Sequence, residues 1–269
     1  MDALIAFFDD LSTVHKFIWV MGCLSIGMLI EGVRPFFRSS FSWPHLRTNL
    51  ALMGSTIAIN AIVGALSVGV FEWVALEQIG LLSIVEWSAA AEFVVALLAL
   101  DLIGQYLVHY VLHKQPLLWR LHTVHHSDTH VDATTGTRHH PIDFLIREMF
   151  ALVAVVLFGI PLAYYAFYRI ATIAFTYFTH ANFRLPDSVD RVLSWVIISP
   201  NMHKFHHHKS MPWTDCNYGN ILSIWDRMFG TLVYDDPEKI VYGLDITDAQ
   251  RSDDLGYQLG LPWRKLDSR

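Results

Sequence analysis

Residues 101–127 read DLIGQYLVHYVLHKQPLLWRLHTVHHS, and this stretch decides the fold. Its first half is apolar, and its second half repeats histidine at intervals of three and four residues. Residues three and four apart share one face of a helix. The stretch therefore predicts an apolar helix that leads into a helical cluster of imidazoles. Because neutral imidazole is the commonest metal ligand in proteins, it also favours a metal site at the end of that helix.

The composition of the whole chain is that of a membrane protein. Of its 269 residues, 53% are hydrophobic and 16% are charged, with a mean hydropathy of +0.36. Soluble domains carry roughly 25% charged residues, which argues against a soluble enzyme and against intrinsic disorder. The net charge of -6 leaves no basic surface for nucleic acid. Cys23 and Cys216 lie far apart and lack CxxC spacing, which disfavours both a disulfide framework and a thiolate site.

Apolar segments divide the chain, and a segment that crosses a bilayer as a helix needs about 20 residues. We expect spans at about residues 17–31, 50–72 and 81–112, and a helical hairpin at 148–180. Residues 1–269 then form a single membrane-embedded domain whose cap comprises 113–145 and 181–269. The predicted fold is all-α: an integral membrane four-helix bundle with a helical cytoplasmic cap that carries the metal site.

Basic residues beside the spans predict the orientation, because they favour the cytoplasmic side. Arg34, Arg38 and Arg47 lie between the first two spans, whereas Glu72 and Glu77 follow the second. This pattern places the N-terminus outside and the histidine-rich segments on the cytoplasmic side of a multi-pass protein. The compact chain, which has no fused redox domain, favours a bacterial inner membrane.

The last apolar region is interrupted in its middle by Gly159 and Pro161. Histidine clusters lie before residue 141 and after residue 200, so a shared metal site needs both ends of the region on one side of the membrane. A hairpin that turns at 159–161 meets this need, whereas a single crossing does not. Arg169, in the second arm, should face protein or water because a charge in lipid is costly.

Besides apolar residues, the chain is rich in histidine. Of its 15 histidines, 13 lie between His109 and His208. They form HYVLH at 109–113, HTVHH at 122–126 and HKFHH at 203–207. In each motif the spacing lets the imidazoles converge on one helical face. These eight histidines exceed the roughly four to six ligands of one ion, so the count indicates two metals, and imidazole suits iron.

Five segments between residues 100 and 232 resemble the fatty acid hydroxylase/sterol desaturase superfamily of membrane di-iron oxygenases. They are the stretch quoted above, RHHPID (138–143), FTHANF (178–183), HKFHHH (203–208) and TDCNYGNILSIWDRMFGT (214–231). The resemblance implies two iron ions, with O2 as co-substrate, although a purified sample can carry zinc. It adds His180 to the ligands, while Arg184 stands where some relatives have a second histidine. The implied metal ligands are His109, His113, His122, His125, His126, His180, His203, His206 and His207.

Other polar residues are candidates for orienting these ligands. Asp101 and Gln105 precede His109 and His113 at intervals of four, so we expect one of the two to bond a histidine or to line the substrate cavity. A hydrogen bond between packed helices is the alternative.

Several residues of the cap are assigned in the same way. His140 is either a ligand or a residue that bonds one. Asp215, Asn217 and Asp226 are expected to bond ligands, with an ion pair to Arg227 as the alternative for Asp226. The remaining histidines are expected in polar loops (His130 and His139), beside a cluster (His208) and at the membrane interface (His15 and His45).

These features together predict an O2-dependent hydroxylase that acts on a membrane lipid or an acyl- or sterol-like substrate. A desaturase on the same scaffold is the first alternative, followed by a metal-dependent lipid hydrolase. A histidine-rich metal transporter is less favoured, because the histidine triplets lie in polar segments rather than inside several spans. No nucleotide or haem motif is evident, so the electrons should come from a separate ferredoxin, reductase or cytochrome b5-like partner.

Overall fold

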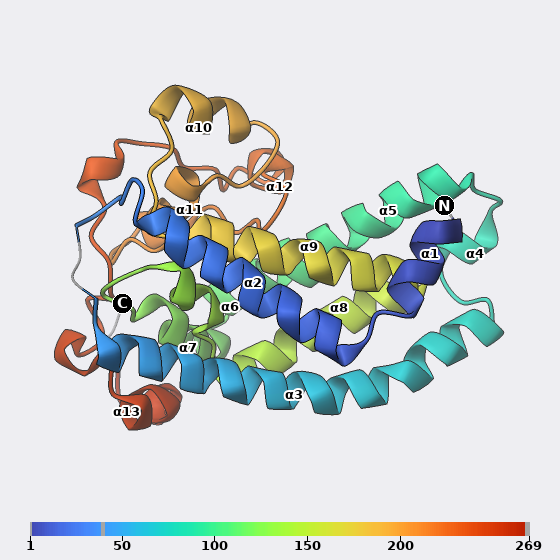
Figure 1. Ribbon diagram of the computed structural model, residues 1–269, viewed down its shortest axis with the longest axis horizontal. Coiled ribbons are helices and arrows are strands. Elements are labelled where there is room, and N and C mark those ends of the chain that lie inside the picture. The colour runs from blue at the N-terminus through green and yellow to red at the C-terminus, as the bar shows by residue number, and fades with distance from the viewer. Residues whose placement is uncertain (1, 39–40, 267–269) are drawn as a thin grey trace.

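The computed structural model describes residues 2–38 and 41–266, and within those ranges the chain is helical without β-strands. Long helices lie side by side and form an elongated bundle (Figure 1). They are α2 (Thr13–Glu31), α3 (Trp43–Leu76), α5 (Ala89–Asp101), α8 (Pro141–Phe158) and α9 (Leu162–His180). The all-α prediction is confirmed. Because each arm of the hairpin is a separate helix, the long helices of the described ranges number five, and the predicted bundle had four.

Serine residues cap the starts of the first three long helices. Ser12, Ser42 and Ser88 each accept a hydrogen bond from the backbone N–H three residues later, at 3.2–3.3 Å. Such caps satisfy N–H groups that have no partner within the helix. α2 and α3 therefore begin earlier than the apolar runs that predicted them, at Thr13 and Trp43.

The third predicted span, residues 81–112, is not continuous. α4 (Leu81–Ile84) is separated from α5 by an extended segment, and α5 passes into a π-helical turn, Leu102–Leu107, before α6 (Val108–Lys114). A π-helix pairs residues five apart and shifts the register of the residues that follow. The polar stripe of Asp101, Gln105 and His109, predicted from a regular α-helix, is therefore broken.

The expected turn of the hairpin is present between α8 and α9. Gly159 ends α8 with a left-handed φ of 73°. It lies directly against Gly80, because a Cβ built on Gly80 would be 2.1 Å from the Gly159 nitrogen. Glycine is needed at position 159 because of its left-handed conformation, and at position 80 because the Gly159 backbone leaves no space for a side chain. The hairpin brings the start of α8 and the end of α9 to the same end of the bundle (Figure 1).

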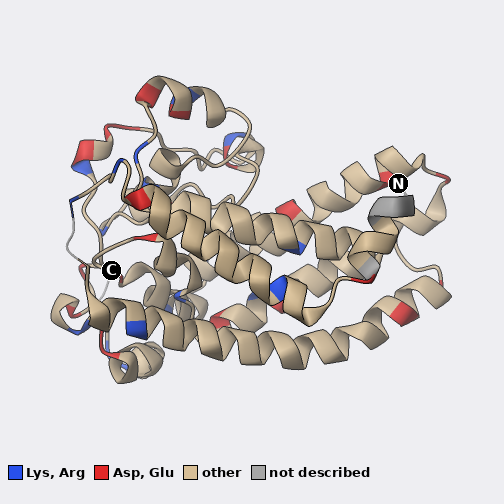
Figure 2. Cartoon of the chain, viewed as in Figure 1, with Lys and Arg blue, Asp and Glu red and all other residues tan. Residues whose placement is uncertain are grey.

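Three helical segments of the described ranges are long and apolar enough to cross a membrane: Thr13–Glu31, Trp43–Ile84 and Ala89–Lys114. The hairpin helices α8 and α9 are not among these three, so the predicted bundle of four membrane helices stays a prediction. Figure 2 shows that charged residues gather at the opposite end of the bundle from α1 (Asp2–Asp9) and α4 and are sparse along the long helices. Arg169 of α9 pairs with Glu148 of α8 at 2.6 Å, so it faces protein as predicted.

The charged end of the bundle is covered by short helices, and we call this region the cap. Its helices are α7 (Pro116–His126), α10 (Asp187–Leu193), α11 (Pro200–His206), α12 (Ile224–Met228) and α13 (Leu255–Gly260). α6 and α7 pack together, and α11 packs on the end of α9. This arrangement brings all three histidine motifs to one end of the bundle.

Candidate metal centre

All nine predicted ligands converge in two buried groups. Group 1 consists of His109, His113, His122, His126 and His206, and group 2 consists of His125, His180, His203 and His207. In each group one nitrogen per ring lies within 4.8 Å of the others. The i and i+4 residues of each motif stay in one group, whereas the middle histidine of each of the two triplets joins the other group. His125 of α7 joins His203 and His207, and His206 of α11 joins His122 and His126.

Acceptors outside group 1 orient its rings. The Nδ1 atoms of His109 and His206 donate to the carbonyl oxygens of Tyr218 (2.8 Å) and Cys216 (2.6 Å). His122 Nδ1 lies 3.0 Å from Oδ2 of Asp143. A carbonyl or carboxylate oxygen only accepts, so each Nδ1 carries the proton and each Nε2 presents a bare lone pair. The sequence predicted these imidazoles but not the acceptors behind them.

Group 2 is built in the same way. His125 Nδ1 donates to the Arg138 carbonyl at 3.2 Å, and His180 Nδ1 donates to the Thr176 carbonyl at 2.8 Å. The Nε2 atoms of these two rings lie 3.2 Å apart, and His203 Nε2 lies 3.1 Å from that of His180. Since the Nε2 atoms of His125 and His180 are both acceptors, they cannot bond each other, and a metal ion between them would satisfy both.

The donor set fits metal ions. In group 1 the Nε2 atoms of His109 and His122 are 3.1 Å apart, and two nitrogens at that separation can share an ion bound at about 2.1 Å from each. Both ring nitrogens of His126 and His207 are buried without a hydrogen-bond partner among the described residues. Such orphaned atoms are costly unless another group satisfies them.

Burial keeps these imidazoles neutral, as ligation requires. It lowers the pKa of His122 to about 3 despite the charge of Asp143, and it lowers the pKa of His125, His126, His206 and His207 well below the usual range. Protons therefore do not compete with a metal at neutral pH.

Two carboxylates contact ligand rings. Asp215 lies 3.2 Å from His113 Nδ1 and also pairs with Lys114. Asp143 was not predicted, yet it is fully buried and contacts His122, His139 and Arg147. Its place as the last residue of RHHPID was the only signal in the sequence.

The other acids predicted to bond ligands do not touch a ligand ring. Asp101 accepts from Tyr168 Oη (2.5 Å) and Trp225 Nε1 (2.7 Å), so it joins α5 to α9 and the cap. This is the helix-packing alternative, and it follows from the π-helical break. Asp226 accepts from the Tyr218 and Gly219 N–H groups and makes no ion pair with Arg227. Its link to His109 is indirect, because the carbonyl of Tyr218 is the acceptor of His109 Nδ1.

Asn217 and His140 also have other partners. The Asn217 side chain bonds the backbone of Met202 and Val233, with φ at 51°, and so holds α11 against the following loop. His140 caps α8, where its Nδ1 accepts from Ile142 N–H at 3.2 Å, and its ring contacts Trp263. His140 belongs to neither histidine group.

Two histidines have contacts that the sequence did not predict. His139 lies in the loop before α8, as expected, but its ring stacks on His125 with ring centroids 4.5 Å apart and lies 3.2 Å from Asp143. His45, expected at the membrane interface, is buried and pairs with Asp128 at 3.0 Å. Tertiary contacts decide both positions, because neither residue belongs to a helical histidine repeat.

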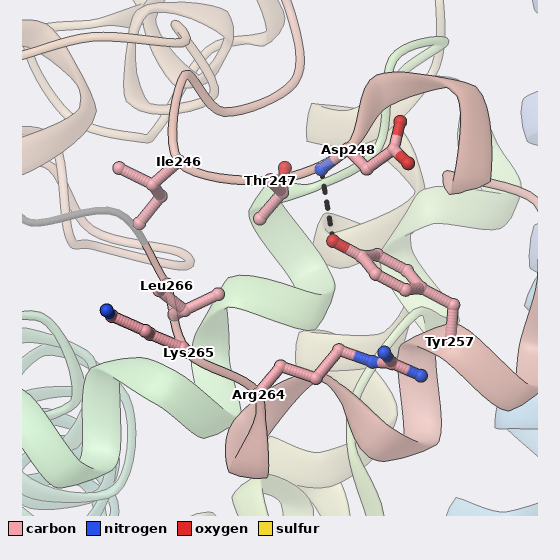
Figure 3. Close-up of a pocket in the computed structure, with 7 residues that line it drawn as sticks. All are labelled: Ile246, Thr247, Asp248, Tyr257, Arg264, Lys265 and Leu266. Carbon is pink, nitrogen blue, oxygen red and sulfur yellow. Dashed lines mark hydrogen bonds between the residues drawn. The ribbon is translucent and has the colours of Figure 1, made fainter.

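A cavity of about 210 Å³ reaches the histidines from inside the bundle. His109, His125, His180 and His203 line one end, and Gln105 also lines the cavity. A second, larger pocket of about 610 Å³ lies between α13 and the C-terminal segment and contains no histidine (Figure 3). Of these two cavities in the described part of the chain, the first is the one that histidines of the candidate metal centre line.

The geometry defines a helical protein with two adjoining all-histidine sites at one end of an apolar bundle. A family model described as fatty acid hydroxylase matches residues 93–231, just over half of the chain and the part that holds all nine histidines. The chain belongs to the fatty acid hydroxylase family, which confirms the resemblance seen in the sequence.

Individual relatives share the same region. An ornithine lipid hydroxylase of Rhizobium tropici is 30% identical over 146 residues, 54% of this chain and 43% of the relative. An alkylglycerol monooxygenase of Xenopus tropicalis is 30% identical over 158 residues, 59% of this chain and 34% of the relative. A cholesterol 25-hydroxylase-like protein of Danio rerio is 27% identical over 206 residues, 74% of this chain and 76% of the relative. The chain matches less than half the length of the first two. No solved structure matches it.

Proposed function

We propose that the protein is an O2-dependent di-iron hydroxylase that inserts oxygen into a C–H bond of a membrane lipid, using electrons from a separate donor. One observation carries this proposal: nine buried histidines divide into groups of five and four. Six of them have Nδ1 against a fixed oxygen acceptor, which leaves Nε2 facing the group. When bound, two iron ions would supply the activation of O2 that C–H oxidation requires.

The residues of the chain would hold the metals and exclude water. Group 1 and group 2 would each bind one ion, and His125 and His206 would link the sites by crossing between α7 and α11. Carbonyls and carboxylates behind the rings would fix their orientation and raise their basicity. The cavity beside group 2 would position the substrate C–H bond. Asp143 and Asp215 would remain charged behind His122 and His113.

The membrane arrangement is part of the proposal. The helical bundle would lie in the bilayer, and the cap with the histidines would face the cytoplasm, as the positive-inside pattern predicts. The protein would then be an inner-membrane enzyme of a bacterium. A ferredoxin, a reductase or a cytochrome b5-like protein would approach the cap to deliver electrons. The ornithine lipid hydroxylase and the alkylglycerol monooxygenase to which the chain is similar support a lipid as the substrate.

Comparative lipidomics under air, with and without the gene, tests this function. A lipid that is 16 Da heavier when the gene is present supports hydroxylation, whereas one 2 Da lighter supports desaturation. Products that form equally without O2 would exclude both. Metal analysis of the purified protein should give two ions per chain, and metal that crosses a liposome membrane would favour a transporter.

A further inference from the structure

The cavity that reaches the histidines is polar at both ends. At the end remote from the histidines its lining includes Asn60 of α3, Glu148 of α8 and Arg169 of α9. Arg169 precedes His180 by eleven residues in α9, a separation of about 16 Å along a helix. Most of the remaining lining is apolar and suits a hydrocarbon chain, but such a chain offers nothing to the charged and amide groups at this end.

Glu148 and Arg169 form an ion pair between the two arms of the hairpin, and part of the Arg169 side chain stays exposed to the cavity. Arg169 Nη2 lies 2.6 Å from Glu148 Oε1, and Tyr165 Oη donates to Glu148 Oε2 at 3.1 Å. The Glu148 side chain is 2% exposed, but that of Arg169 is 23% exposed and lines the cavity. The guanidinium, with five N–H donors, therefore keeps donors for a ligand. Ionisable groups inside a bundle of this kind usually mark a substrate path.

The size of the cavity limits what it can take. A volume of about 210 Å³ is below the roughly 300–1,000 Å³ of pockets that enclose a whole drug-sized ligand. Only part of a lipid can therefore enter. The cavity reaches the outer surface beside α3, because Ile57 and Asn60 line it and are exposed, Ile57 at 45%. The part of the lipid that does not fit in the cavity can leave there into the bilayer.

We propose that the cavity binds the head group of the lipid, and that Glu148 and Arg169 bond an uncharged hydroxyl or amide of that head group. The pair supplies both an acceptor and donors but no net charge. The third charged residue of the lining, Arg147, is paired with Asp143, so the site matches a neutral polar group better than an anion. The carbon that reaches the histidines then lies about 16 Å from this group, along the chain rather than in the head group. This inference rests on the proposed function, because it names the substrate class of the same site.

Equilibrium binding to the metal-loaded protein in lipid nanodiscs tests the inference without turnover. The probes are hexadecylglycerol, hexadecyl propyl ether, which has the same skeleton without the two hydroxyls, and palmitate. The wild type should bind hexadecylglycerol about tenfold more tightly than either other probe, as expected for a hydrogen bond to a charged group. Equal affinities, or tighter binding of palmitate, would overturn the inference.

Paired substitutions locate the effect without leaving a buried charge unpaired. E148L/R169M should abolish the preference for hexadecylglycerol, whereas E148Q/R169Q should keep most of it. The surface pair in R251Q/D254N serves as the control and should leave the preference unchanged. A preference that survives in E148L/R169M would assign it to other residues and contradict the inference. If the wild type shows the preference but produces no O2-dependent oxidation, the proposed function fails and the inference about binding stands.

Discussion

Asp143→Asn is the substitution that most directly tests how the metal centre is assembled. Asp143 Oδ2 lies 3.0 Å from His122 Nδ1, and Oδ1 accepts from Arg147 Nε at 3.2 Å. Burial raises the pKa of Asp143, but Arg147 and His122 outweigh it and hold the pKa well below its usual range. The side chain is therefore a carboxylate that fixes the His122 ring and balances Arg147.

Asparagine keeps the shape of the side chain and removes its charge. Loss of a group that orients a ligating histidine typically weakens metal binding about 10–100-fold, or about 1.4–2.7 kcal/mol. Arg147 Nη2 lies 3.5 Å from His122 Nδ1, so its uncompensated charge would add repulsion toward a bound cation. We therefore expect the upper half of that range for the ion in group 1.

Competition with a chromophoric iron chelator measures this change. Asp101→Asn is the matched control, because Asp101 is equally buried and hydrogen-bonded but contacts no histidine ring. It should lower thermal stability and leave the iron affinity unchanged. An Asp143→Asn protein that binds both ions within about twofold of the wild type would refute the role of Asp143.

Three further predictions concern the ligands and the hairpin. His125→Ala and His206→Ala should each lower the metal content of the purified protein and abolish lipid oxidation, since each removes a proposed ligand from one group. Mass spectrometry of the bound metal and of the lipids checks both, and full activity in either variant would contradict the ligand set. His140→Ala should lower the melting temperature because a helix cap contributes about 1 kcal/mol, yet two ions should remain bound; loss of one ion would instead make His140 a ligand. Gly159→Ala should destabilise the protein by at least about 1–2 kcal/mol, the cost of the left-handed conformation. The new Cβ would also lie 2.3 Å from the Ile79 carbonyl, so an unchanged melting temperature would contradict the close contact between these two segments.

The family resemblance added His180. Periodicity alone was sufficient to single out the other eight histidines of the two groups, because the spacing of histidines along a helix is a local property. It could not divide them between the two groups. His122, His125 and His126 lie on one face of α7, and only the approach of α11 separates His125 from its neighbours. That approach depends on packing between segments about 80 residues apart, and no local pattern encodes it.

The supporting acids show the same limit. Asp101 lies four residues before Gln105, and a regular helix would place both below His109, but the π-helical turn of Leu102–Leu107 directs Asp101 to Trp225 instead. Asp143 lies 21 residues from the His122 ring that it orients. The hairpin, by contrast, was predictable. Gly159 and Pro161 interrupt an apolar region that has histidine clusters on both sides, and a shared site brings its two ends together.

Oxygen labelling tests the central claim most directly. The iron-loaded protein in nanodiscs of its host membrane lipids is supplied with reduced ferredoxin and ferredoxin reductase under ¹⁸O2, and the lipids are analysed by mass spectrometry. The account predicts a lipid 18 Da heavier than its precursor, absent from the His125→Ala protein. A product that takes its oxygen from water, or no oxidised lipid from a protein that carries two iron ions, would contradict it.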